Sequence, residues 1–164
     1  MTFVRLFATF ALAISLAWPA VGYADPRPLA LAEHDEITRL VHAMFDAARD
    51  GDAHALANVL PDDAQFARLF MPGTEPLVER HRRAVARALD DLRARFAGGQ
   101  FVAMRGLDAG SVVHTDRCSP FALPQSECLD GPVIEWTVNG ETRRMRINKL
   151  VRVDGHWRIF APRM

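Results

Sequence analysis

Apolar residues in the first half of the chain recur at steps of three and four positions, which is the spacing of an amphipathic helix. The apolar stripe over residues 37–48 predicts a helix of about four turns that ends at Asp50-Gly51. Asp52 then suits the N-cap of a short helix, because its side chain can accept a hydrogen bond from a backbone N–H of the first turn. Pro61 ends that short helix.

Two further helices are predicted before residue 100. Asp62 or Asp63 suits the N-cap of a short one, and Thr74 with Pro76 marks the first turn of the longest one. The longest helix runs to about Phe96 and ends at a Gly-Gly pair. Most of its charged residues lie off its apolar stripe, which indicates a solvated face.

From residue 100 onward the pattern changes to that of strands. The dipeptides Asn139-Gly140 and Asp154-Gly155 favour tight hairpin turns, because they adopt positive φ angles readily. Helices followed by strands, without βαβ alternation, predict an α+β fold whose N-terminal helices pack on one face of a curved antiparallel sheet. Four or five strands are expected in a meander, namely Phe101–Leu107, Ser111–Thr115, Pro132–Val138, Glu141–Val153 and His156–Ala161.

Two-residue turns also fix the register of the last two hairpins. The two hairpins then disagree in phase, which a bulge near Asn148-Lys149 would correct. Alternatively, the sheet is apolar on both faces here, and Val151, Val153 and Phe160 are covered by a loop or a second subunit. The pairs expected are Glu135 with Arg144, Ile134 with Met145, Leu150 with Ile159, and Arg152 with Trp157.

The N-terminus has the order of regions found in a secretory signal peptide. A single charge at Arg5 precedes the apolar run of residues 6–18, and Pro19 and small residues follow up to Ala24. Cleavage is expected after Ala24, so that residues 1–24 are removed and residues 25–164 form a single periplasmic or secreted domain. Contact with a membrane is then expected only through the signal segment, and a retained membrane anchor is the alternative.

Composition and cysteine content narrow the function classes. The 164 residues include 20 basic and 20 acidic side chains, so no excess of positive charge favours a nucleic-acid partner. Cys118 and Cys128 lie in a segment rich in Ser, Pro, Asp and Gly, which predicts a disulfide within a surface loop of an exported protein. A redox-active pair is the alternative.

The order of these elements resembles the nuclear transport factor 2-like superfamily, which has a cystatin-like cone fold. The resemblance rests on the amphipathic first helix, the Gly51-Asp52 break, the capped second helix and the final hairpin that reads Lys-Leu-Val-Arg-Val-Asp-Gly-His-Trp-Arg-Ile over residues 149–159. It implies a curved sheet wrapped around helices, with an internal pocket. The long helix and the cysteine segment are less typical of the superfamily.

The resemblance leaves the activity open, because members of the superfamily include isomerases, dehydratases, ligand carriers and association domains. The Tyr-and-Asp acid pairing of its steroid isomerase branch does not carry over. The sole tyrosine here, Tyr23, lies in the predicted signal peptide.

Candidate chemistry centres on histidines. His81 falls on the apolar stripe of the longest helix, where an imidazole can be a general base, a hydrogen-bond donor in a pocket or a core group. His114 and Asp116 lie two residues apart at a predicted strand end, close enough for one to orient the other. The residues expected to line a ligand pocket are His81, Phe96, Trp136 and Trp157.

Other site types find less support in the sequence. No H-x-x-x-H, C-x-x-C, EF-hand or G-x-S-x-G pattern occurs, so neither a metal site, a cofactor nor a nucleophilic triad is expected. The last strands are basic, and a carboxylate ligand or an acidic partner could exploit this. Solvated charges that discourage edge pairing are the simpler interpretation of Arg143, Arg144, Arg146, Arg152 and Arg158.

Three functions follow as hypotheses. The leading one is a non-enzymatic exported domain that binds a small apolar or amphipathic ligand, or a protein partner, through the cone pocket. The second is an acid/base enzyme of the isomerase or dehydratase type, in which His81 and His114 converge on the pocket. The third is a homodimerising association module that buries an exposed patch of Val151, Val153 and Phe160.

Overall fold

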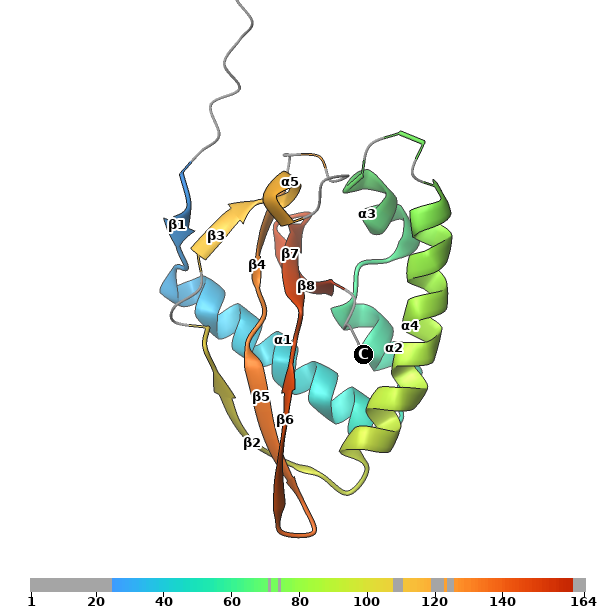
Figure 1. The fold of residues 1–164 in the computed structure, drawn as a ribbon, viewed down its shortest axis with the longest axis vertical. Coiled ribbons are helices and arrows are strands. Elements are labelled where there is room, and N and C mark those ends of the chain that lie inside the picture. The colour runs from blue at the N-terminus through green and yellow to red at the C-terminus, as the bar shows by residue number, and fades with distance from the viewer. Residues whose placement is uncertain are drawn as a thin grey trace, which may run out of the picture.

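Helices fill the first half of the chain and strands most of the second half (Figure 1). The computed structural model describes residues 25–160, except residues 71, 74, 108–110, 119–122 and 124–125 and the side chains of residues 75, 81 and 89. The predicted signal peptide and the predicted turn at residues 108–110 therefore lie outside the described residues. Within the described part, each helix is too short or too polar to cross a bilayer.

The starts of the second and third helices and the end of the first lie where the sequence predicts them. Helix α1 (Leu31–Asp50) begins earlier than the stripe suggested and ends at Gly51, whose φ of 72° lies in the left-handed region. Helix α2 (Ala53–Val59) is capped by Asp52, which accepts a hydrogen bond from the N–H of Ala55 at 2.9 Å. Helix α3 (Asp63–Arg68) is capped by Asp62, in a capping box with Gln65.

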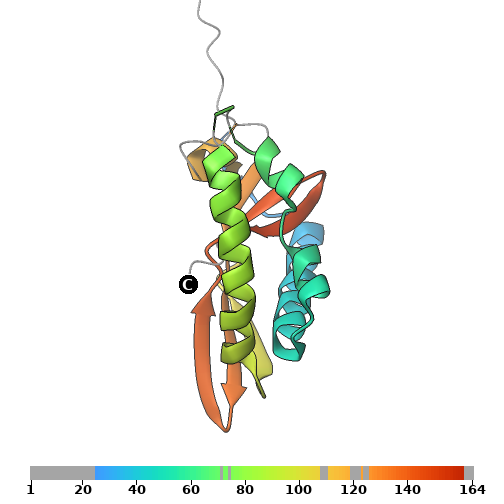
Figure 2. The ribbon, with the colours of Figure 1, turned by 90° about the vertical axis from the view of Figure 1, so that its right-hand side faces the viewer.

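Helix α4 (Glu75–Phe96) is the longest helix and runs along the length of the molecule (Figure 2). It packs against α1 and α3. Its bounds agree with the prediction from the Thr-Glu-Pro start and the Gly-Gly end, although Thr74 itself lies outside the described residues.

The strands form two antiparallel sheets, so the expected single meander is wrong. One sheet has five strands in the order β1-β3-β4-β7-β8, and the other has three in the order β2-β5-β6. A four-residue helix, α5 (Thr115–Cys118), follows β3. The described strands are β1 (Arg27–Pro28), β2 (Gln100–Arg105), β3 (Ser111–His114), β4 (Glu127–Asp130), β5 (Val133–Val138), β6 (Glu141–Arg146), β7 (Lys149–Val153) and β8 (His156–Phe160).

The predicted strand over residues 141–153 is split between the two sheets. It breaks at residues 147–148, where the chain leaves the three-stranded sheet and enters the five-stranded one. A bridge to the β4–β5 connection fills the gap, since the N–H of Ile147 donates to the carbonyl of Pro132 at 2.9 Å and that of Gly131 to the carbonyl of Asn148 at 3.2 Å. This break resolves the phase conflict that a bulge was expected to correct.

The predicted register of both hairpins is confirmed. All four expected pairs occur, in β5–β6 and in β7–β8. Asn139 and Asp154 have φ angles of 52° and 53°, as the tight turns require.

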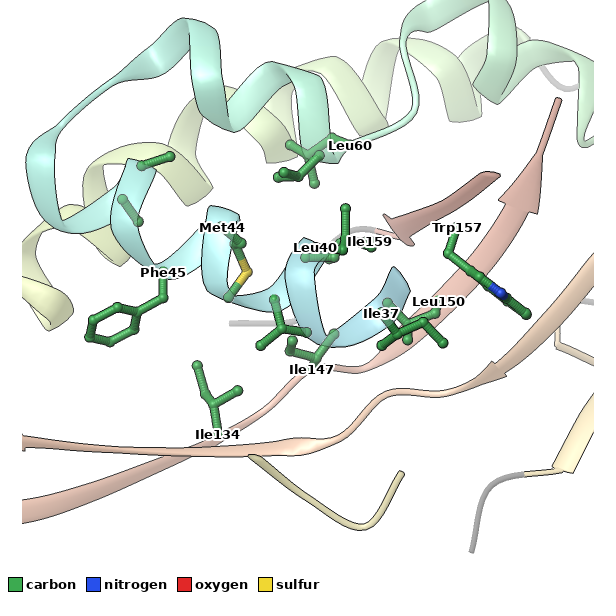
Figure 3. Packing of buried hydrophobic residues seen from close by; sticks show 14 of the residues in the cluster. Ile37, Leu40, Met44, Phe45, Leu60, Ile134, Ile147, Leu150, Trp157 and Ile159 are labelled. Carbon is green, nitrogen blue, oxygen red and sulfur yellow. The ribbon is translucent and has the colours of Figure 1, made fainter. Parts of the chain in front are cut away.

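The main core lies between α1 and both sheets. Residues of α1 such as Ile37 and Met44 face Ile134, Ile147 and Leu150 of the sheet side (Figure 3). The buried side chains are close-packed apolar groups, and burial of this kind is the main source of stability in a domain of this size.

A second apolar cluster covers the opposite face of the five-stranded sheet. Val151 and Val153 pack against α3 residues and partly buried residues of α4. Helices therefore lie on both faces of this sheet, and the prediction of helices on one face is wrong here. The expected exposed patch of Val151, Val153 and Phe160 is also wrong, because the chain itself covers it.

Candidate functional site

A cleft of about 420 Å³ opens where the two sheets part. The chain leaves one sheet at Arg146 and enters the other at Lys149, so the strands diverge there. Strand β3 and helix α5 border the gap on the other side. The cleft is lined by Gly106, Ser111, Val113, Arg117, Cys118, Leu129, Asp130, Arg146 and Lys149.

Positive charge dominates the walls of this cleft, which we call the basic cleft. Among the described lining residues, Arg117, Arg146 and Lys149 accompany one carboxylate, Asp130, so these four charges sum to +2. Lys149 is ion-paired with Asp130. Arg146 is exposed and has no ion-pair partner among the described residues. Such a concentration of one charge sign in a concave site attracts anions.

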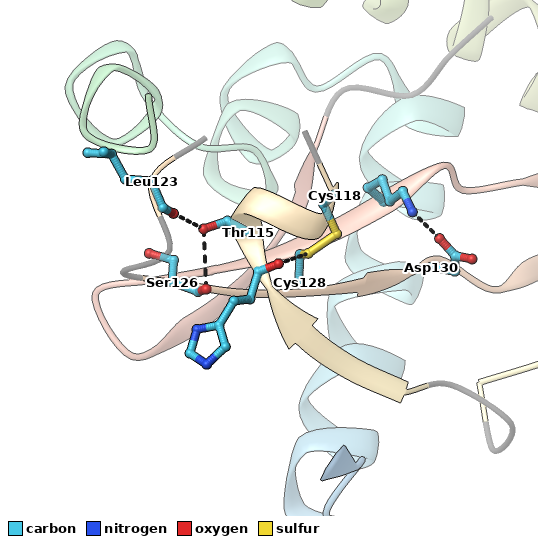
Figure 4. Close-up of a disulfide and its surroundings, with 8 residues drawn as sticks. Thr115, Cys118, Leu123, Ser126, Cys128 and Asp130 are labelled. Atoms are coloured by element: carbon cyan, nitrogen blue, oxygen red, sulfur yellow. Dashed lines mark hydrogen bonds and ion pairs between the residues drawn. A yellow bond between two sulfur atoms is a disulfide. The ribbon is translucent and has the colours of Figure 1, made fainter. Parts of the chain in front are cut away.

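Cys118 lines the basic cleft, and its predicted disulfide with Cys128 is confirmed. It joins α5 to β4 with a Cα–Cα distance of 6.5 Å (Figure 4). The expectation of a surface loop is wrong for Cys128, which is 1% exposed on β4. The bridge ties a single helical turn to the sheet.

Hydrogen bonds of Thr115 hold the other end of α5. Its N–H and its hydroxyl both donate to the carbonyl of Ser126, at 2.9 and 3.2 Å, and the hydroxyl also contacts the carbonyl of Leu123 (Figure 4). Arg117 therefore stands on a turn that is anchored at both ends. A fixed backbone lowers the entropic cost of positioning the Arg117 side chain on a ligand, compared with a mobile loop.

A small apolar pocket lies beside the basic cleft and shares Cys118 and Lys149 with it. Its other walls are mostly apolar residues of β7, of β8 and of the segment that follows α3. Its free space is about 10 Å³, which is roughly the room of one water molecule. This pocket is therefore too small for an organic ligand.

The sequence-predicted histidine site is only partly visible. The side chain of His81 lies outside the described residues, so its convergence with His114 stays a prediction. His114 is half-buried at the end of β3, and Asp116 lies in α5. Neither lines the basic cleft, and the Oδ1 atom of Asp116 is buried without a hydrogen-bond partner in the described part of the chain.

The aromatic residues expected to line a pocket lie in the core instead. Phe96, Trp136 and Trp157 are 0%, 3% and 0% exposed. Phe96 contacts Trp136 edge-on, with ring centroids 4.8 Å apart. None of the three lines the basic cleft or the apolar pocket. Large apolar side chains predict burial, but the sequence does not distinguish a core from a pocket wall.

A second charged site links β1, β4 and β7 of the five-stranded sheet to the first turn of α1. Arg27 hydrogen-bonds both Glu33 and Glu127 at 2.7–2.8 Å, and Arg152 contacts the same two carboxylates at 3.0 and 3.1 Å. The hydrogen bonds from Arg27 lower the pKa of Glu33 to about 2, against the opposing effect of burial. We call these four residues the ionic clasp. Two cations and two anions cancel, so the ionic clasp is charge-neutral, unlike the basic cleft.

Sequence reasoning found part of the basic cleft and missed the rest. It noted Arg146 among the basic strand residues, but Arg117, Asp130 and Lys149 come together only through the packing of α5 and β4. Within the described ranges, no group of three or more His, Cys, Asp and Glu side chains is arranged to hold a metal ion.

Comparisons of the chain with models of protein families, with curated proteins and with solved structures find no match. The resemblance to the nuclear transport factor 2-like superfamily therefore stays a prediction from the sequence. The charges and contacts of the described residues are the basis for a function.

Proposed function

We propose that this protein is an exported, non-enzymatic binding domain that holds a small anionic ligand, a carboxylate or a phosphate, in the basic cleft. One observation carries the proposal: Arg117, Arg146 and Lys149 converge on a cleft of about 420 Å³, and the one carboxylate among its described lining residues, Asp130, is paired with Lys149. A volume of this size suits a small organic molecule.

The chemistry of the lining residues favours binding over catalysis. Guanidinium groups stay protonated at physiological pH, so Arg117 and Arg146 donate hydrogen bonds without exchanging protons. Asp130 is engaged by Lys149. Carboxylates and phosphates match the planar fork of arginine, which binds two oxygens at once.

The remaining walls support a ligand with both an anionic and an apolar part. The half-buried Val113 provides apolar surface beside the cations. A purely apolar ligand is less well supported, because the neighbouring apolar pocket has room for about one water molecule. The disulfide supports export, since such bridges persist in oxidising compartments.

Isothermal titration of the purified protein with inorganic phosphate, citrate and a short fatty acid tests this function. Choline chloride at matched ionic strength serves as the control for screening by salt. Binding of phosphate alone indicates a phosphate site, and binding of citrate or the fatty acid indicates a carboxylate site. No measurable binding of any of the three anions overturns the proposal.

Two arginine variants on one strand locate the binding site. Arg146→Ser should weaken anion binding by about tenfold, which corresponds to the loss of about 1.4 kcal/mol. Arg143→Ser removes the same charge from the same strand but outside the basic cleft, so it should leave the affinity nearly unchanged. Equal losses in both variants would show that general surface charge, and not the basic cleft, binds the anion.

A further inference from the structure

Strand β6 is an open edge of the three-stranded sheet. It pairs with β5, and no other described strand pairs with it. Five of its six residues are exposed, and Met145 is half-buried. The β5–β6 hairpin extends beyond the helices at one end of the molecule (Figure 1). An edge strand presents unpaired N–H and C=O groups, which can pair with another chain.

The other sheet edges of the described chain are each less able to pair with a further strand. β1 is two residues long, and β2 has a register shift between Phe101 and Ala103. At β8, the N–H of Trp157 donates to the carboxylate of Glu36 at 3.0 Å, so a side chain of α1 occupies part of that edge. β6 has six residues paired in continuous register with β5. It is therefore the edge best suited to accept a further strand.

The outer face beside this edge is positively charged. Arg144 of β6 and Arg105 of β2 both contact Glu135 of β5, at 2.7 and 3.1 Å, and their side chains are 68% and 67% exposed. Arg146 lies two residues beyond Arg144 and so on the same face. Among the residues of this face that the structure describes, these three cations and one buried carboxylate sum to a charge of +2.

We propose that β6 accepts an extended acidic segment of a protein partner as an additional strand. Alternate acidic residues of the segment face Arg144 and Arg146, because side chains two residues apart in a strand share one face at a spacing of about 6.6 Å. Backbone hydrogen bonds supply affinity and the charge pattern supplies selectivity. This inference goes beyond the proposed function, since it concerns the edge of β6, although it shares Arg146 with the basic cleft.

The same charges disfavour a second copy of this chain as the occupant. Pairing β6 with itself would bring arginines of the two copies close to one another, and like charges across a strand pair are destabilising. An acidic strand converts that repulsion into attraction. The arginines thus select against self-association and in favour of an acidic partner.

Fluorescence anisotropy with labelled peptides tests the inference. The probe is a synthetic peptide with glutamate at alternate positions and threonine or valine between them. A peptide of the same composition with all glutamates adjacent should bind at least fivefold more weakly. A third peptide has the alternating sequence with N-methylated amides along one edge, which removes backbone donors without changing the charge. It should bind at least tenfold more weakly.

Protein variants separate this inference from the proposed function. Arg144→Gln should weaken the alternating peptide about tenfold and leave anion binding in the basic cleft unchanged, because Arg144 does not line the cleft. Lys149→Gln should weaken anion binding and leave the peptide unchanged. Circular dichroism of each variant establishes that the fold is retained.

Two outcomes would overturn strand addition. If the N-methylated peptide binds as tightly as the unmodified one, charge alone holds the peptide. If a single-stranded oligonucleotide of equal charge binds as tightly as the peptide, the outer face is a general polyanion site.

Discussion

The two sheets of this protein use arginine and glutamate in opposite ways. In the five-stranded sheet, Arg27 and Arg152 are matched by Glu33 and Glu127, and the four groups close one end of the sheet without net charge. In the three-stranded sheet, Glu135 is shared by two exposed arginines, and Arg146 nearby has no ion-pair partner within the described part of the chain. The charge that is cancelled in one sheet is left available in the other.

The two sheets also differ in how much of their surface the helices cover. The five-stranded sheet is packed on both faces, by α1 on one side and by α3 and α4 on the other. The three-stranded sheet buries one face, and its outer face carries the exposed arginines Arg105, Arg144 and Arg146. The first sheet is therefore covered on both faces, and the second leaves a charged face open to solvent.

The largest effect should come from removing a helix contact of the five-stranded sheet. Phe66 of α3 stacks on Phe160 and contacts Phe70, with ring centroids 5.4 and 4.8 Å apart. Phe66→Ala should lower the free energy of unfolding by about 3 kcal/mol, because it leaves a cavity in a packed cluster. Urea denaturation measures this change.

Met145 is the matched position in the three-stranded sheet. It is half-buried at the open edge, so Met145→Ala should lower the free energy of unfolding by only about 1 kcal/mol. Similar losses in Phe66→Ala and Met145→Ala would mean that both sheets are equally structural, which would remove the contrast between them.

An intermediate effect is expected from the ionic clasp. Glu33→Gln should lower the free energy of unfolding at pH 7 by about 2 kcal/mol, between the values for exposed and fully buried ion pairs. The change leaves Arg27 and Arg152 with one carboxylate in place of two.

The stability that Glu33 supplies should depend on pH in a defined window. The pKa of Glu33 is lowered to about 2 in the folded protein, from an ordinary value of 4.5. The contribution is therefore present above pH 4.5 and is lost as the pH falls toward 2, because the unfolded chain takes up the proton first. Thermal unfolding at several pH values should show this slope in the native chain and a shallower one in Glu33→Gln. The exposed Glu141→Gln serves as the control, and the same flattening there would contradict the assignment to Glu33.

The fold was predictable wherever one local rule decided it. Caps at Asp52 and Asp62 and the turn dipeptides after β5 and β7 fixed helix starts and hairpin register, and both were confirmed. Strand β4 and the division into two sheets were missed. Strand β4 is four residues long and lies in a segment of turn-forming residues, and its position depends on pairing with β7, which is distant in sequence.

The candidate site was less predictable than the fold. The strand arginines could be seen as a basic run, but Arg117 reaches the basic cleft only because the disulfide and Thr115 fix α5 beside it. Trp136 and Trp157 were expected in a pocket, but they are core residues. The sequence could not show this, because buried residues and residues that line a pocket have the same apolar pattern. Sites assembled from distant segments require the tertiary structure.

The smallest effect on stability should be the most informative about the three-stranded sheet. Glu135 is buried, but its partners Arg105 and Arg144 are mostly exposed, and exposed ion pairs contribute about 1 kcal/mol or less. Glu135→Gln should therefore cost about 1 kcal/mol in urea denaturation. It should also raise the affinity of the outer face for the alternating acidic peptide several-fold at low salt, since the net charge of that face rises from +2 to +3.

Glu127→Gln is the matched control for this last variant, because it removes the same charge from the ionic clasp and should leave peptide binding at β6 unchanged. A loss of stability in Glu135→Gln as large as in Glu33→Gln would place Glu135 among the structural ion pairs. The ion pairs of the outer face would then stabilise the fold, as those of the ionic clasp do. The contrast between the five-stranded sheet and the three-stranded sheet would not hold.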